Sequence, residues 1–73
     1  MIVRYCYHEG NLYVVDHVVR LDKTVPFKPF VYAGECEVTM HTQDRSIGAT
    51  YIIDSPYIMH LDEAVSKYPE WFI

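Results

Sequence analysis

Six side chains in this sequence could bind a soft metal ion or act as a reactive nucleophile. They are Cys6, Cys36, His8, His17, His41 and His60. A tetrahedral zinc site takes four such ligands, and Cys6 and His8 would share one face of a strand. The spacing shows neither a Cys-x-x-Cys pair nor two paired knuckles. We therefore expect no metal, with a small metal-binding module kept as an alternative.

Nucleophilic catalysis would need an exposed thiolate beside a histidine. Cys36 alternates with Val38 and Met40, so its sulfur should face the core, where a thiol is unreactive. No Gly-rich phosphate loop, Gly-x-Ser-x-Gly elbow or His-Glu-x-x-His pair occurs. We predict that the protein is not an enzyme and uses no cofactor.

Length and composition favour one small domain over residues 1–73. The chain has 73 residues, of which 51% are hydrophobic, so it can form one core but not several. Its net charge of -4 and its scattered basic residues argue against direct binding to nucleic acid. No apolar run reaches the length of a membrane span, and no leader is visible after Met1. We expect a cytoplasmic monomer.

A cytoplasmic location also affects whether the two cysteines are oxidised. Cys6 and Cys36 could form one disulfide, but a reducing cytoplasm favours two buried thiols.

The N-terminal part predicts a hairpin of strands over residues 2–8 and 12–21, joined by a tight turn at Gly10 and Asn11. One face, which should cover the core, would pair Tyr7 with Val14, Val3 with Val18, and Tyr5 with Asp16. The other face would pair Cys6 with Val15 and Arg4 with His17. Tyr5 opposite Asp16 is then either a satisfied hydroxyl, which we favour, or part of an exposed polar site.

Residues 22–29 should form a loop or an edge, because two prolines remove amide donors. Phe27 and Phe30 flank this stretch, and they either pin it to the core or offer an aromatic knob to a partner. We favour pinning, because exposed aromatic patches are uncommon on small monomers.

A second hairpin is expected from residues 30–32, a turn at Ala33 and Gly34, and a strand over 35–41. That strand alternates most clearly, with Cys36, Val38 and Met40 inward and with Glu35, Glu37, Thr39 and His41 outward. A further strand is predicted over 49–53. Residues 57–61 suit a helix or a strand, and we favour an extended conformation.

The C-terminal part predicts a helix over residues 61–68, ended by Pro69. Leu61, Val65 and Tyr68 form its apolar stripe, which should pack on the sheet. The final residues 71–73 are either the last piece of the core or a binding tail. The predicted fold class is α+β: a small antiparallel sheet of three to five strands with one short C-terminal helix on one face.

Partner-binding residues are expected in two groups. The N-terminal strand has only one neighbouring strand in sequence, so it should be an edge, on which Val3, Tyr5 and Tyr7 anchor a partner or are simply core. Glu35 and Glu37 project together from their strand. With Asp62 and Glu63 at the helix start they could meet a basic patch on a protein partner.

The chain resembles the small host-takeover proteins of lytic bacteriophages, being acidic, rich in tyrosine and built as a minimal sheet with one helix. In size and style it is similar to an RNA polymerase inhibitor and antiterminator of a Xanthomonas phage. The helix start at residues 61–64, Leu-Asp-Glu-Ala, resembles that of another phage inhibitor of the polymerase.

The resemblance implies an inhibitor that docks on host bacterial RNA polymerase in the host cytoplasm, where it impedes promoter opening or termination. A rival from another class is a phage inhibitor of a bacterial defence or restriction enzyme, which the same compact, acidic character would suit.

Overall fold

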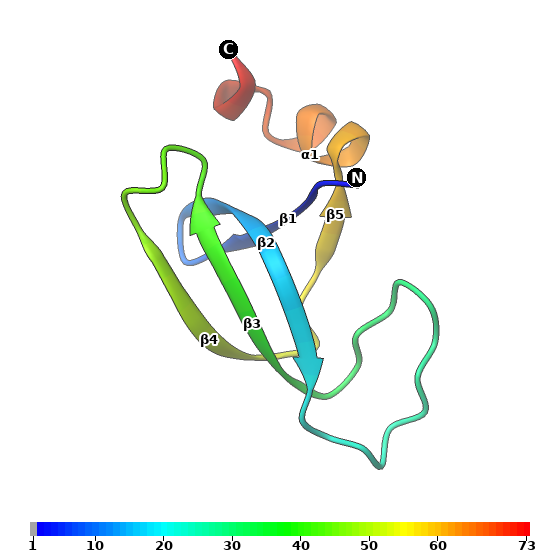
Figure 1. The fold of residues 1–73 in the computed structure, drawn as a ribbon. Coiled ribbons are helices and arrows are strands. Elements are labelled where there is room, and N and C mark those ends of the chain that lie inside the picture. Colours follow the sequence, from blue (N-terminus) through cyan, green and yellow to red (C-terminus); the bar gives the residue numbers. More distant parts are fainter. Residues whose placement is uncertain (1) are drawn as a thin grey trace.

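The computed structural model describes residues 2–73 and shows one antiparallel sheet followed by two short helices (Figure 1). The elements in chain order are β1 (Arg4–His8), β2 (Asn11–Arg20), β3 (Glu35–Thr42), β4 (Gly48–Asp54), β5 (Ile58–His60), α1 (Leu61–Lys67) and the 3-10 helix η1 (Pro69–Phe72). The strand order is β4-β3-β2-β1-β5, so the first four strands form a meander and the fifth returns to pair with β1. The predicted α+β class is confirmed.

The first hairpin forms, but its turn lies one residue earlier than predicted. Glu9 and Gly10 are the central residues and both have positive φ, at 48° and 88°, as a type I′ turn requires. Tyr7 therefore pairs with Leu12 and Tyr5 with Val14, so the predicted pairings were wrong by two positions. A shift of two residues leaves the side chains up to Val15 on their predicted faces.

Strand β2 contains a bulge at Asp16, which shifts its register against β3. Val15 pairs with Met40 and His17 with Thr39, which leaves Asp16 as the extra residue between them. Because of this insertion, Val15 and Val18 both lie against the same core although they are three residues apart. Tyr5 does not face Asp16, because it pairs with Val14.

Each face of the sheet carries a hydrophobic core, and the two cores lie over different parts of the sheet. The first core lies on one face and consists of Cys6, Tyr13, Val15, Cys36, Val38 and Met40. The second lies on the other face, beneath α1 and η1, and consists of Tyr5, Leu12, Met59 and Ala64. The inward positions of Cys36, Val38 and Met40 are confirmed, with exposed fractions of 0%, 0% and 1%.

The helix forms where expected but packs through a different residue. Of the predicted stripe, Tyr68 packs on the second core, but Leu61 and Val65 are exposed, and the fully buried helix residue is Ala64. Since α1 has only seven residues, one small side chain is enough to seat it on β1 and β5. Trp71 and Phe72 pack on the second core.

The predicted strand over residues 30–32 was wrong. Only an isolated bridge between Lys28 and Val31 forms there, and Phe30 has a φ of 66° that no strand allows. Residues 21–34 instead form one long loop, whose anchor in the first core is Tyr32. Phe27 and Phe30 do not pin the loop, because they are 55% and 75% exposed.

Candidate functional site

The three predicted anchor residues near the N-terminus do not share one surface. Strand β1 lies between β2 and β5, so the prediction that it is an edge was wrong. Tyr5 is buried edge-on against Phe72, with ring centroids 5.4 Å apart. Tyr7 is partly exposed but stacks on Tyr68 at 4.5 Å, and only Val3 is free of such packing among the three.

The four acidic residues also divide between two places. Glu35 and Glu37 lie near the start of β3, whereas Asp62 and Glu63 lie at the start of α1, at the opposite end of the sheet (Figure 1). Val3 and Asp62 line one small hollow beside β5, together with Ile2, His60 and Leu61. The structure therefore gathers Val3, Asp62 and Glu63 near β5 and leaves the β3 pair apart from them.

A concave surface made of two adjoining hollows lies beside β5, and we call it the aromatic groove. Its two walls are residues 30–33 of the long loop and residues 55–58 of the segment that enters β5. One hollow of about 300 Å³ lies between these walls. A second of about 220 Å³ shares Phe30, Tyr32, Tyr57 and Ile58 with the first and is closed by Arg4, His60 and Glu63.

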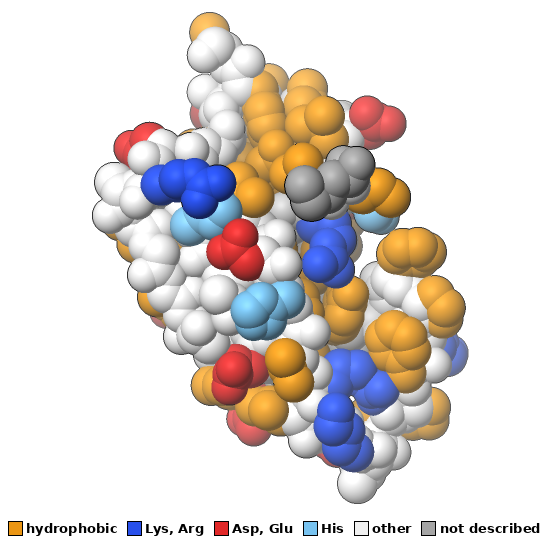
Figure 2. All heavy atoms as spheres, in the orientation of Figure 1, with side chains coloured by type: hydrophobic (Ala, Val, Ile, Leu, Met, Phe, Trp, Pro, Cys, Tyr) orange, Lys and Arg blue, Asp and Glu red, His pale blue; other side chains and the backbone are white. Residues whose placement is uncertain are grey.

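Exposed hydrophobic side chains line this groove. Phe30 is 75% exposed, Val31 54% and Tyr57 55%. Figure 2 shows hydrophobic side chains interleaved with basic ones over the long loop, while acidic side chains and histidines lie over the exposed face of the sheet. An apolar surface of this kind typically marks an interaction site.

Tyr57 is held in the groove wall by two residues of α1. Its hydroxyl donates a hydrogen bond to the Glu63 carboxylate, and Lys67 Nζ lies 3.2 Å from the same hydroxyl. Lys67 also lies 3.1 Å from Glu63 and 4.5 Å from the centre of the Tyr57 ring. Glu63 thus positions an aromatic wall residue and is not a free charge.

The opposite wall is anchored at both ends of the long loop. Arg20 donates to the carbonyl of Val25, and its guanidinium carbon lies 5.1 Å from the centre of the Phe27 ring. Arg4 donates to the hydroxyl of Tyr32 at 3.0 Å. At the loop's end, Gly34 and Ser55 exchange two hydrogen bonds of 2.8 and 3.0 Å, which join the two walls.

Replacing Gly34 with alanine should destabilise the protein more than the same change at Gly10. Both glycines have positive φ, so both variants lose about 1 kcal/mol to backbone strain. At Gly34 a Cβ would also come within 3.1 Å of Asp22 and 3.2 Å of Val25, whereas at Gly10 it meets nothing. Urea unfolding of the two variants measures the difference, and equal losses would contradict this packing.

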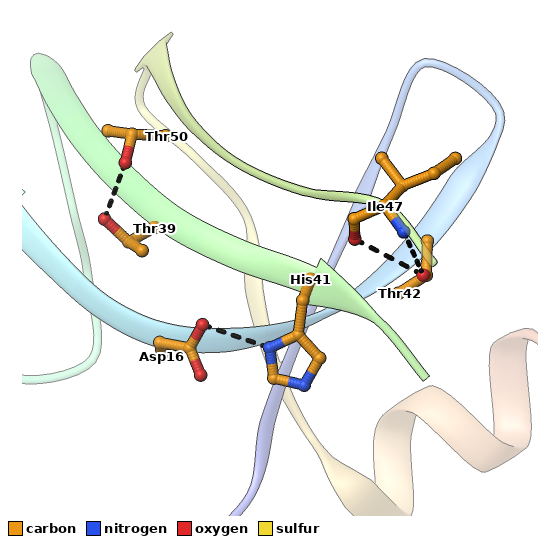
Figure 3. Close-up of polar contacts among 6 residues, drawn as sticks. All are labelled: Asp16, Thr39, His41, Thr42, Ile47 and Thr50. Carbon is orange, nitrogen blue, oxygen red and sulfur yellow. Dashed lines mark hydrogen bonds and ion pairs between the residues drawn. The ribbon is translucent and has the colours of Figure 1, made fainter. Parts of the chain in front are cut away.

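The exposed face of β2, β3 and β4 carries polar side chains in two bonded pairs (Figure 3). His41 Nδ1 lies 3.0 Å from Asp16 Oδ2, and the hydroxyls of Thr39 and Thr50 are 3.0 Å apart. The bulge at Asp16 directs its carboxylate toward the imidazole across the strand boundary. Neither pair includes a cysteine or serine that could act as a nucleophile.

Both thiols lie in the first core, on the other face of the sheet. Burial raises the pKa of Cys6, and burial also raises the pKa of Cys36 against the opposing effect of Arg20. A raised pKa leaves little thiolate at neutral pH, so neither sulfur suits nucleophilic attack.

The turn between β3 and β4 is organised by one carboxylate. Asp44 accepts hydrogen bonds from the Ser46 amide and hydroxyl at 3.0 and 2.7 Å, and from the Thr42 hydroxyl at 2.8 Å. The buried Thr42 hydroxyl in turn accepts from the Ile47 amide at 3.1 Å (Figure 3). The bonds from Ser46 and then Thr42 lower the pKa of Asp44 to about 2.

This lowered pKa predicts a specific loss of stability in acid. A carboxyl group with a pKa near 3.9 when unfolded and about 2 when folded contributes stability above roughly pH 4, and that stability is lost as the pH falls toward 2. The difference in unfolding free energy between the wild-type protein and Asp44→Asn should therefore shrink as the pH falls from about 4 to about 2. Urea unfolding from pH 6 to pH 2 measures it, and a constant difference would contradict the prediction.

Within residues 2–73, no group of three or more His, Cys, Asp or Glu side chains is arranged to hold a metal ion. Over the same residues, no helix has the length and apolar character needed to cross a membrane.

Comparison with known proteins found no match: no family description, no curated protein and no solved structure is significantly similar to this chain.

The groove was missed in the sequence because its walls are far apart along the chain. Residues 30–32 were expected to form a strand followed by a turn at Ala33 and Gly34, and residues 57–61 were expected only to be extended. One signal was present in the sequence: Phe27 and Phe30 were considered as exposed aromatic residues that contact a partner. Their exposure supports that alternative, and Phe30 is the member that lines the groove.

Proposed function

We propose that this protein is a non-enzymatic inhibitor that binds a host bacterial protein through the aromatic groove. The observation that carries the proposal is the groove itself, two adjoining hollows lined by exposed aromatic and aliphatic side chains. Aromatic side chains supply much of the energy in protein interfaces because they bury a large area at small entropic cost.

The shape of the groove favours an extended segment of the partner. Two successive hollows of about 300 and 220 Å³ can each take a large side chain. The groove runs beside β5, which is one of the two edge strands of the sheet. A segment lying there could add its backbone to β5 while its side chains enter the hollows, as in other cases of strand addition.

Host RNA polymerase is the partner that we propose, on the resemblance to phage host-takeover proteins. In this proposal the protein acts in the host cytoplasm, blocks transcription initiation and reduces termination by occupying the polymerase surface. It needs no cofactor and does not bind nucleic acid directly. The net charge of -4 supports a protein partner over a phosphate backbone.

The proposal is tested with purified bacterial RNA polymerase holoenzyme and a template that carries a promoter and a terminator. Saturating protein should bind the holoenzyme, reduce promoter opening and increase readthrough. Normal opening and termination at saturating protein would overturn the proposal. Restored phage plating in a defence-positive strain, with transcription unaffected, would instead favour inhibition of a defence enzyme.

A further inference from the structure

The outer edge of β4 is the longest unpaired strand edge in the part of the chain that the structure describes. Strand β4 spans seven residues and ends the sheet on the side away from β5. Its sequence, Gly-Ala-Thr-Tyr-Ile-Ile-Asp, contains no proline and no lysine or arginine. Natural edge strands commonly use these residues to prevent pairing with another chain, and β4 lacks them.

The hydrogen bonds of the adjacent turn show which groups of β4 face outward. The Thr42 amide donates to the Ile47 carbonyl at 2.7 Å, so residues 42 and 47 form a bonded pair. Bonded and non-bonded pairs alternate along an antiparallel ladder. Ala49, Tyr51 and Ile53 therefore direct their backbone groups toward β3. The outward amides and carbonyls belong to Gly48, Thr50, Ile52 and Asp54.

These four residues are spaced symmetrically about Tyr51, and no other backbone group of residues 2–73 satisfies their outward amides and carbonyls. We propose that β4 pairs antiparallel with β4 of a second copy of this chain, about a two-fold axis at Tyr51. In that register Thr50 of each copy exchanges hydrogen bonds with Ile52 of the other, and Gly48 does so with Asp54.

The side chains of the edge suit this register. Asp54 is the only charged residue of β4 and meets uncharged Gly48, so no like charges face each other. Ile52, now 55% exposed, would lie beside Thr50 of the second copy and lose solvent contact. The occupied edge is opposite β5 in the strand order, so each copy keeps its aromatic groove open.

Sedimentation equilibrium of the full chain tests the proposal. Over a range from about 10 µM to about 1 mM, which covers weak specific association, the mass should rise from 8.6 kDa to twice that value. Ile52→Lys, which adds a charge to the paired edge, should weaken association at least tenfold. Val19→Lys makes the same change at an exposed position on β2 and should associate like wild type.

A cross-linking variant tests the register. Tyr51→Cys should form a disulfide-linked dimer on mild oxidation, because non-bonded antiparallel partners have Cα atoms about 4.5 Å apart. Thr24→Cys, in the long loop, should not. The native cysteines are buried and should not react. A monomer throughout, association beyond two copies, unchanged association of Ile52→Lys, or no cross-link at Tyr51 would overturn the proposal.

Discussion

Replacing Leu12 with alanine should remove about 3 kcal/mol of stability, the largest loss that we expect from any single truncation in the second core. Leu12 is fully buried between the sheet and the C-terminal helices, where it packs with Tyr5, Met59 and Ala64. A domain of this size has only about 5 kcal/mol in total. The variant should therefore be close to unfolding at physiological temperature.

Leu21→Ala is the matched control, because it deletes the same atoms from a side chain that is 42% exposed. It should cost less than about 1 kcal/mol. Urea unfolding followed by circular dichroism measures both variants. A loss at Leu12 no larger than that at Leu21 would show that the second core does not support the fold as described.

Replacing Phe30 with alanine should weaken binding to RNA polymerase by about 30-fold, equivalent to about 2 kcal/mol. Phe30 lines both hollows of the aromatic groove and is largely exposed in the free protein. Its truncation removes the central contact of the proposed interface. It should leave the free energy of unfolding almost unchanged, because little of the ring is buried.

Val19→Ala serves as the control for Phe30, since Val19 is 44% exposed on β2 and does not line the groove. It should bind the polymerase with wild-type affinity. Biolayer interferometry on immobilised holoenzyme compares the three proteins. Equal affinities for wild type and Phe30→Ala would exclude the groove as the binding surface.

The alternation of apolar and polar residues predicted strands well where one face of the sheet is exposed to solvent and the other is buried. Strand β3 shows this best, because Cys36, Val38 and Met40 alternate with polar residues and occupy the first core as expected. The strand at β4, the extended segment at β5 and the helix were also found at nearly the predicted positions. These elements carry their signal within a few adjacent residues.

The features that were missed depend on residues far apart in sequence. β5 joins the sheet beside β1, and that pairing converts the expected edge strand into an interior one. The bulge at Asp16 changes the facing of every later residue of β2, and no local pattern marks it. The helix packs through Ala64 because its seating on β1 and β5 decides which face is buried.

The candidate site was the least predictable part for the same reason. Of the predicted binding residues, Val3, Asp62 and Glu63 lie near β5, but Tyr5 is core and Glu35 and Glu37 lie elsewhere. The groove walls are joined by hydrogen bonds between Gly34 and Ser55, which are 21 residues apart in the chain. Such a contact depends on the complete fold and leaves no periodic signal in the sequence.

The central claim, that the aromatic groove binds the polymerase, is tested most directly by amide hydrogen exchange. The protein is measured alone and with a saturating amount of RNA polymerase holoenzyme, with exchange resolved along the chain. We predict that the complex slows exchange in residues 27–33 and 55–60 and leaves the amides of β2 and β3 unchanged. Protection confined to β2 and β3, or no protection at saturation, would contradict the proposal.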